Sequence, residues 1–458
     1  MLSTITLLLL PAVAIASVQV QEPSDIIPPS QWAADNELIS DYNAPFPANG
    51  QPKDLVGVHK VGGKSVSVDH VKWTTKENDT SIVLVSKDGD FAASYSEFVK
   101  YGYSSNLNWA SFYGFNAAIN VANNSAAVLD HVNITVHNGA ANVFAYGTGT
   151  VINVTNSWLY SSGPVSHGLY AAGNGTIYGK NLLHYAGGHR SSAFSGDGPA
   201  GYIHVEDSVS RVSGIGSATY YALGEIHANN VASVSEQGPV VFSDGWQKTY
   251  LKNCQAEAGL LAGTVLFSSS VRRSGAVLDL EDTKITTKGK DMPGLWFGNV
   301  IAEARLKSVE LNVPSGTLAV ANFSQVTQDF DYFGGYADNP SMEPAQVKLA
   351  VLESSLSGDL VAYNKSSIAI SLKENSNWKG TTRVGYKSAS FGVALDYSSK
   401  WTLTADTTVL NFTNQDRSNS NIQSRGHNIY YSSSAPANKW LGGKTVKLPG
   451  GGKLKPKK

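Results

Sequence analysis

The sequence predicts an all-β fold, a single-stranded right-handed parallel β-helix with coils of about 24 residues. From about residue 60, short runs of Val, Ile, Leu, Thr and Tyr alternate with Gly, Asn and Ser, and no helical pattern lasts beyond a turn or two. A polar residue also recurs before a short strand, with first spacings of 25, 23, 25, 26, 23 and 23 residues, at Asn108, Asn133, Asn156, Asn181, Asp207, Asn230, Asn253 and, more loosely, Asp282.

This period selects the β-helix among repeat folds. It is too short for a propeller blade, and the Leu-x-x-Leu-x-Leu signature of leucine-rich repeats is missing. Strands on stacked coils lie about 4.8 Å apart, so equivalent Asn side chains can hydrogen-bond from coil to coil. Asn also tolerates the left-handed backbone that the turns need. We therefore expect an asparagine ladder and, because a stacked amide cannot carry a glycan, an unmodified Asn133.

Four segments are predicted along the chain. Residues 1–16 form an apolar run that is typical of a secretory signal peptide. Residues 17–59 are rich in Pro and predict an extended arm that caps the first coil. Coils are expected over residues 60–435, with a loop around Gly334, Gly335, Pro340 and Pro344. Residues 436–458 predict a C-terminal cap and a basic tail.

Composition limits the binding partners and the cellular compartment that we expect for this protein. The chain has 35 basic and 36 acidic residues without a basic mid-chain segment, so nucleic acid is not an expected partner. Cys254 is the only cysteine, which excludes an intrachain disulfide. No later run reaches the roughly 18 apolar residues that a membrane span needs. We expect a secreted protein, extracellular or in the cell wall.

Eight Asn-x-Ser/Thr sequons indicate a eukaryotic secretory route. One is Asn133, whose ladder position argues against modification. Glycosylation is predicted at the other seven, Asn78, Asn123, Asn153, Asn174, Asn322, Asn364 and Asn411.

The densest group of ionisable and aromatic side chains lies between residues 167 and 248. Counted from each coil's ladder residue, Asp197 falls at +16, Glu225 at +18 and Asp244 at +14. Carboxylates one or two coils apart would be separated by about 5 or 9.6 Å, which brackets the spacing in retaining and inverting glycosidases. We take these three as candidate catalytic residues, with ordinary solvated turn residues as the alternative. Candidate substrate-binding residues are Trp246, His189, Arg190, Lys248 and His167.

Other chemistry is not indicated. The five histidines from 167 to 227 occupy different positions in their coils, so they predict no metal site. No Gly-x-Ser-x-Gly elbow and no phosphate-binding loop followed by a helix is present, and no cofactor is expected.

Two stretches carry a resemblance to a known group of proteins: NSWLYSSGPVSHGLYAAGNGTIYGKN at 156–181 and ANKWLGGKTVK at 437–447. They resemble exported β-strand-repeat proteins of the pectin-lyase-like superfold from fungi and bacteria, often described as adhesin-like. The resemblance implies the fold and an extracellular setting, without a defined active site. The superfold's polygalacturonase-type enzymes would show an Asp-Asp pair and Gly-His-Gly, whereas this chain has no such pair and only Ser166-His167-Gly168. Pectate lyases would show a calcium-binding aspartate cluster, which is also missing.

Two classes of function remain open from the sequence. The first is a non-catalytic extracellular protein that binds glycans or cell-wall polymers through ladders of Asn, Thr, Tyr and Trp. The second is an extracellular enzyme of unrecognised type that acts on a polysaccharide or a small secreted metabolite, in a carboxylate-lined groove near residues 167–248. The ionisable side chains of that region favour the second class only if they converge.

Overall fold

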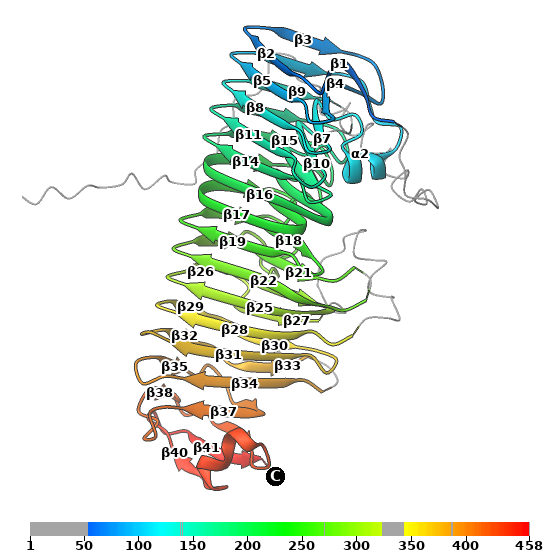
Figure 1. Ribbon diagram of the computed structural model, residues 1–458. Helices are drawn as coiled ribbons and strands as arrows, with labels where there is room; N and C mark the ends of the chain where they lie inside the picture. The colour runs from blue at the N-terminus through cyan, green and yellow to red at the C-terminus, as the bar shows by residue number, and fades with distance from the viewer. Residues whose placement is uncertain are drawn as a thin grey trace, which may run out of the picture.

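The computed structural model describes residues 54–322 and 343–457, apart from 138, 140, 270, 386 and 387. These residues form a parallel β-helix of about 15 turns, which confirms the predicted fold (Figure 1). The predicted signal peptide, most of the predicted arm, and Gly334, Gly335 and Pro340 of the predicted loop lie outside the described residues. None of the helices in the described ranges is long and apolar enough to cross a membrane.

Each coil contributes strands to three faces, which we call A, B and C. Two long strands, β16 (Phe194–Val212) and β17 (Tyr220–Ser235), run through all three. Face A also contains β2 (Ser65–Asp69), β5 (Asp90–Ser94), β8 (Ala126–Asp130), β11 (Val151–Thr155), β14 (Thr176–Lys180), β19 (Lys248–Lys252), β22 (Arg273–Glu281), β25 (Val300–Lys307), β28 (Gln346–Leu352), β31 (Ser367–Lys373), β34 (Ser390–Leu395) and β37 (Asn411–Asn414).

Faces B and C complete the coil. Face B contains β1 (Val56–Gly62), β4 (Thr80–Ser86), β7 (Ile119–Ala122), β10 (Val143–Tyr146), β13 (Leu169–Ala172), β18 (Val241–Asp244), β21 (Thr264–Phe267), β24 (Leu295–Gly298), β27 (Thr317–Ala321), β30 (Asp359–Ala362) and β33 (Thr382–Val384). Face C contains β3 (Lys72–Thr75), β6 (Glu97–Lys100), β9 (Asn133–Val136), β12 (Trp158–Ser161), β15 (Leu183–Ala186), β20 (Gln255–Ala258), β23 (Lys284–Thr287), β26 (Glu310–Asn312), β29 (Ser355–Ser357), β32 (Asn377–Lys379), β35 (Lys400–Thr402) and β38 (Ile422–Gln423).

The C-terminal end is closed by a small sheet of β36 (Thr407–Val409), β39 (Ile429–Ser432), β41 (Lys453–Lys457) and β40 (Val446–Lys447). Strand β40 is antiparallel to β41, which ends the parallel stacking. The 3₁₀ helix η2 (Pro436–Leu441) packs against β37.

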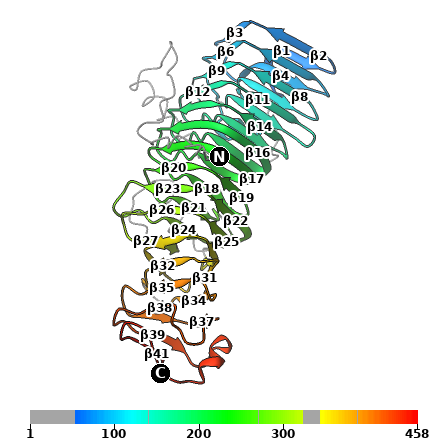
Figure 2. The same ribbon diagram turned by 90° about the vertical axis from the view of Figure 1, so that its left-hand side faces the viewer.

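The core fills the inside of the coils. Because side chains of a strand alternate between its two sides, one residue in two points inward. Ile152, Ile177, Ile203 and Ile226 form one such buried row on face A. Figure 2 shows that the axis of the β-helix bends, with β17, β19, β22 and β25 along the inner side of the bend. Face A is therefore the concave side.

The ladder at the corner between faces A and C is confirmed from Asn156 onward. Its residues have a left-handed backbone with φ from 47° to 55° at Asn156, Asn181, Asp207, Asn230, Asn253 and Asp282. The amide of Asn181 donates to Asn156 Oδ1 at 2.8 Å, and that of Asn230 to Asp207 Oδ1 at 2.8 Å, whereas that of Asn253 donates to Asn229 Oδ1 at 3.0 Å and so leaves the predicted ladder.

The two earlier ladder positions were predicted wrongly. Asn133 is exposed and pairs with Trp158, two residues beyond Asn156, so His131 occupies the ladder position with φ 53°. Asn108 lies in helix α2 (Leu107–Tyr113). The side chain of Asn106 caps that helix by accepting a hydrogen bond from the backbone N–H of Trp109, as N-cap Asn residues do. The stacking argument against a glycan on Asn133 therefore no longer applies.

Candidate functional site

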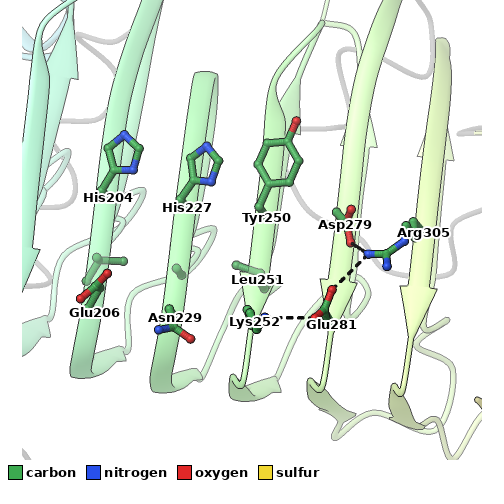
Figure 3. A pocket seen from close by; sticks show the side chains of 12 residues that line it. His204, Glu206, His227, Asn229, Tyr250, Leu251, Lys252, Asp279, Glu281 and Arg305 are labelled. Atoms are coloured by element: carbon green, nitrogen blue, oxygen red, sulfur yellow. Dashed lines mark hydrogen bonds and ion pairs between the residues drawn. The ribbon is translucent and has the colours of Figure 1, made fainter. Parts of the chain in front are cut away.

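A groove runs along the outer surface of face A. Its central column consists of residues in register on successive strands, Asn153, Tyr178, His204, His227, Tyr250, Asp279, Arg305, Ala350, Ser371, Ala394 and Thr413. A cavity of about 390 Å³ lies between His204 and Arg305 (Figure 3). A second of about 590 Å³ continues from Asp279 to Thr413. Because both are lined by Asp279 and Arg305, they form one groove, whose two parts we call the narrow half and the wide half.

An aromatic row begins the narrow half. The ring centroids of Tyr178 and His204 are 4.8 Å apart, those of His204 and His227 4.8 Å, and those of His227 and Tyr250 4.5 Å, with interplanar angles of 17°, 8° and 10°. The spacing equals the rise of one coil, so stacking follows from the register. Burial and the charge of His227 lower the pKa of His204, although Glu225 and Glu206 act against them. Figure 3 shows the rings of His204, His227 and Tyr250 side by side on neighbouring strands.

Charges in the groove are paired. Each acid that lines it has a basic partner, in the pairs Glu206–Lys180 (3.4 Å), Asp279–Arg305 (2.7 Å), Glu281–Lys252 (3.1 Å) and Glu303–Lys348 (2.8 Å). Burial acts to lower the pKa of Arg305, but the hydrogen bonds and charges of Asp279 and Glu281 outweigh it and raise that pKa. Lys180 lies outside the lining, so the lining itself has four acids and three bases and no excess of positive charge.

Beside the aromatic row, Glu225 fixes one ring. Its Oε1 lies 2.6 Å from His227 Nε2, and its Oε2 lies 3.6 Å from Lys248 Nζ. Burial acts to raise the pKa of Glu225, but the hydrogen bond and charge of His227, together with Lys248, lower it. Glu225 and Lys248 share a register position, as their common predicted offset requires.

The three candidate carboxylates do not form one column, which corrects the prediction. Glu225 lies on face A, whereas Asp197 and Asp244 lie on face B. The offsets of Asp197 (+16) and Asp244 (+14) end on face B, whereas the larger offset of Glu225 (+18) passes the corner into face A. Asp197 and Asp244 do share a column, since each lies two residues after the in-register residues Ser195 and Phe242, two coils apart. That separation corresponds to about 9.6 Å.

Asp197 is the most deeply buried of these acids, with 6% of its surface exposed. Its Oδ2 accepts a hydrogen bond from Tyr170 Oη at 2.6 Å and its Oδ1 one from the backbone N–H of Gly198 at 2.7 Å. Burial raises the pKa of Asp197 to about 6 and the charge of Asp244 adds to this effect, although both hydrogen bonds oppose it. Burial likewise raises the pKa of Asp244, against the hydrogen bonds from Ser269 and the charge of Arg273.

The predicted substrate-binding residues are dispersed. Trp246 is 37% exposed in the turn between β18 and β19, and Lys248 flanks the groove. His189 and Arg190 are half-buried in a turn ahead of face B. His167 is 2% exposed, and its Nδ1 accepts from the backbone N–H of Ser192 at 3.0 Å, so its ring is part of the protein interior.

Comparison with family models, curated proteins and solved structures finds no match to this chain. Its function must therefore be inferred from its own residues. Within the described ranges, no three His, Cys, Asp or Glu side chains are grouped so that they could hold a metal ion.

Tyr178, Tyr250, Asp279 and Arg305 were missed by sequence reasoning, although a signal for them exists. Tyr178 and Tyr250 each stand three residues before a ladder residue, and so do His204 and His227. Counting backward from the ladder would have placed all four aromatic side chains in one column.

Proposed function

We propose that this protein is a secreted glycoprotein that binds a neutral glycan, such as a cell-wall polysaccharide, along the groove of face A in the manner of an adhesin. The supporting observation is the continuity of the groove, which crosses nine strands from β16 to β37. Eight strand spacings correspond to about 38 Å. A surface of that length suits a polymer better than a small molecule.

The chemistry of the lining supports a glycan. Sugars present both C–H faces and hydroxyl groups, and Tyr and His offer an apolar ring with a polar atom. Because Asp279, Glu281 and Arg305 are engaged with one another or with Lys252, the groove has no surplus positive charge for a polyanion. We therefore favour a neutral polymer over pectate or nucleic acid.

Replacement of Tyr250 by Ala should weaken binding of a neutral wall polysaccharide by at least about tenfold, the 1.4 kcal/mol expected when a central aromatic contact is lost. Titration calorimetry with soluble oligosaccharides, and pull-down with insoluble wall fractions, would measure the change. Tyr397→Ala is the matched control, because Tyr397 is 74% exposed and does not line the groove. Equal binding by both variants, or binding to pectate that salt abolishes, would contradict the proposal.

A second candidate function is an enzyme that uses the buried carboxyls of face B. Asp197, with its raised pKa, is suited to donate a proton near pH 6, and Asp244 lies two coils away in the same column. The substrate would be a polysaccharide or a secreted metabolite.

If this second function holds, Asp197→Asn should lower the rate of substrate turnover by about 10²–10⁴-fold, the usual contribution of general acid catalysis. Release of reducing sugars from wall polysaccharides and NMR of the medium would detect turnover. Asp291→Asn, at an exposed position, is the control and should keep the wild-type rate. A folded Asp197→Asn variant with full activity, or a wild-type protein that turns over none of these substrates, would exclude this candidate.

A further inference from the structure

One sequon lies inside the wide half of the groove. Asn411, Phe412 and Thr413 are consecutive on β37, and Phe412 is fully buried in the core. Asn411 and Thr413 therefore both point outward, and both line the wide half. Asn411 is exposed, so the side chain that would carry a glycan opens directly onto the groove.

The floor next to Asn411 is unusually bare. Gly392 is its register partner on β34, and Ala369, Ser371 and Ala394 complete this part of the floor. The fold does not require a glycine at 392: an added Cβ would come no closer than 3.5 Å to Ala369 and 3.8 Å to Asn411, which is ordinary contact. The backbone at Gly392 would therefore accept a β-carbon, which would point into the groove. The short side chains thus leave room for something that lies against β31 and β34.

The other sequons do not combine these features. Asn78, Asn123 and Asn174 are exposed in turns, Asn364 is half-buried in the turn after β30, and Asn322 is only 8% exposed. Asn133 is exposed on face C, away from the groove. Asn153 stands in the central column one strand before Tyr178, but it does not line either cavity.

We propose that Asn411 carries an N-linked glycan whose first sugars lie on the bare floor of the wide half, where they compete with an external glycan. The competition rests on the proposed binding function, whereas the placement of the sugar rests only on the proposed secretory route. In the modification, a bond forms between Asn411 Nδ2 and C1 of the first sugar. The bond from C1 to a polyisoprenyl diphosphate carrier breaks, and the amide gives up one proton. The carrier diphosphate is the leaving group.

An N-linked glycan fits the chemistry of the wide half. Its charged side chains are paired, as in Asp279–Arg305 and Glu303–Lys348, which suits the neutral N-acetylhexosamine units that begin an N-linked glycan. Only the narrow half, with His204, His227 and Tyr250, then stays open to a ligand. The glycan would set the length of polymer that the groove accepts.

Two substitutions of Thr413 distinguish the effect of the sugar on binding from the effect of a changed groove wall. Thr413→Val removes the sequon but keeps the shape of the side chain, and Thr413→Ser keeps the sequon. If the tethered sugar fills the wide half about nine-tenths of the time, Thr413→Val should bind a long neutral oligosaccharide about tenfold more tightly than Thr413→Ser. Asn133→Gln, on face C, should leave binding unchanged.

Placement of the sugar is read without any ligand. Peptide mapping of the secreted protein, after release by a peptide-N-glycosidase in ¹⁸O water, should show Asn411 converted to ¹⁸O-labelled Asp. Release from Asn411 in the folded protein should be at least several-fold slower than release from the exposed turn sites Asn123 and Asn174. An unmodified Asn411, or a sugar released as fast as at those turns, would overturn the proposal. Loss of all oligosaccharide binding in every variant, together with slow release, would instead reject the binding function alone.

Discussion

Acidification from pH 7 to pH 4 should lower the free energy of unfolding by about 4 kcal/mol, because two histidines are buried in their neutral form. His167 is 2% exposed and His184 is fully buried. Burial lowers the pKa of both to about 3; the hydrogen bond from Ser192 opposes this at His167, and the charge of His167 adds to it at His184. Protonation of either ring would place a charge in the protein interior.

The sign of the effect follows from proton uptake. In the unfolded chain each histidine titrates near 6.5, and in the folded chain near 3. The unfolded chain therefore binds more protons between these values, and the stability present above pH 6.5 is lost as the pH falls toward 3. At 1.36 kcal/mol per pH unit, the two histidines together contribute about 7 kcal/mol to the loss at pH 4.

Asp197 acts in the opposite direction. Its folded pKa of about 6 exceeds the usual 3.8, so the stability that it contributes is fully present below pH 3.8 and is lost as the pH rises through 6. Acidification from pH 6 to pH 4 therefore returns about 3 kcal/mol. Asp130 and Asp416, whose pKa values are lowered to about 2 chiefly by hydrogen bonds from Thr155 and Ser418, stay ionised at pH 4. For His167, His184 and Asp197 taken together, the result is the loss of about 4 kcal/mol.

Urea unfolding at pH 7 and pH 4 would measure this change. Leu159 is the register partner of His184 in the preceding coil, so a leucine at position 184 suits the same inward row. The His184→Leu variant should therefore lose about 3 kcal/mol less stability between pH 7 and pH 4 than wild type. His131→Asn is the control, because His131 is exposed at a ladder position that Asn156 fills in the next coil. Identical pH dependence in wild type and His184→Leu would show that His184 is not buried as described.

The fold could be predicted from the sequence because each coil repeats a backbone turn that favours particular residue types. The ladder from Asn156 to Asp282 was found because a left-handed turn favours Asn and Asp, which the chain uses there repeatedly. In the first coils, Tyr95 and His131 adopt the left-handed backbone of this turn. The position of the turn could therefore not be found there by searching for Asn or Asp. Asn133, two residues away, was chosen instead.

The candidate site could be predicted only in part, since offsets accumulate error along a coil. Glu225 and Lys248 were aligned correctly because the coils between them match in length. Asp197 and Asp244 were not, because their offsets are two to four residues shorter than that of Glu225 and end on face B, before the chain turns into face A. Counting backward by three residues avoids these turns, which is why Tyr178 and His204 stay aligned with the ladder. Short distances from a fixed backbone feature are thus more dependable than long ones.

The stacked tryptophans of the last coils carry a large share of the local stability. Leu356, Trp378 and Trp401, which the sequence spaces by 22 and 23 residues, are in register on β29, β32 and β35. The two indole rings are 5.0 Å apart at an interplanar angle of 10°. Each donates to a carbonyl of the coil before it, Trp378 Nε1 to Gly358 at 2.9 Å and Trp401 Nε1 to Gly380 at 3.0 Å.

Trp401→Ala should therefore destabilise the protein by about 3–5 kcal/mol, the usual cost of removing a fully buried Trp. The substitution leaves a cavity beside Trp378 and removes the donor to the Gly380 carbonyl. That coil cannot collapse into the space easily, since an added Cβ at Gly380 would lie 2.1 Å from the Gly358 carbonyl oxygen. Urea unfolding gives the total, and hydrogen exchange should show the loss first in β32, β35 and β38, because a β-helix coil contacts only its neighbours.

Trp401→Phe separates packing from hydrogen bonding. Phe keeps a ring against Trp378 but cannot donate a hydrogen bond to the Gly380 carbonyl. Trp401→Phe should therefore destabilise the protein less than Trp401→Ala does. We expect a loss of about 1–3 kcal/mol, from the unsatisfied carbonyl and the smaller ring. Tyr397→Ala, four residues earlier and 74% exposed, should change the stability by less than about 0.5 kcal/mol. A Trp401→Ala variant as stable as Tyr397→Ala would mean that the C-terminal coils do not unfold with the rest of the β-helix. Their stability would then have to be sought in the closing sheet of β36 and β39 rather than in the tryptophan stack.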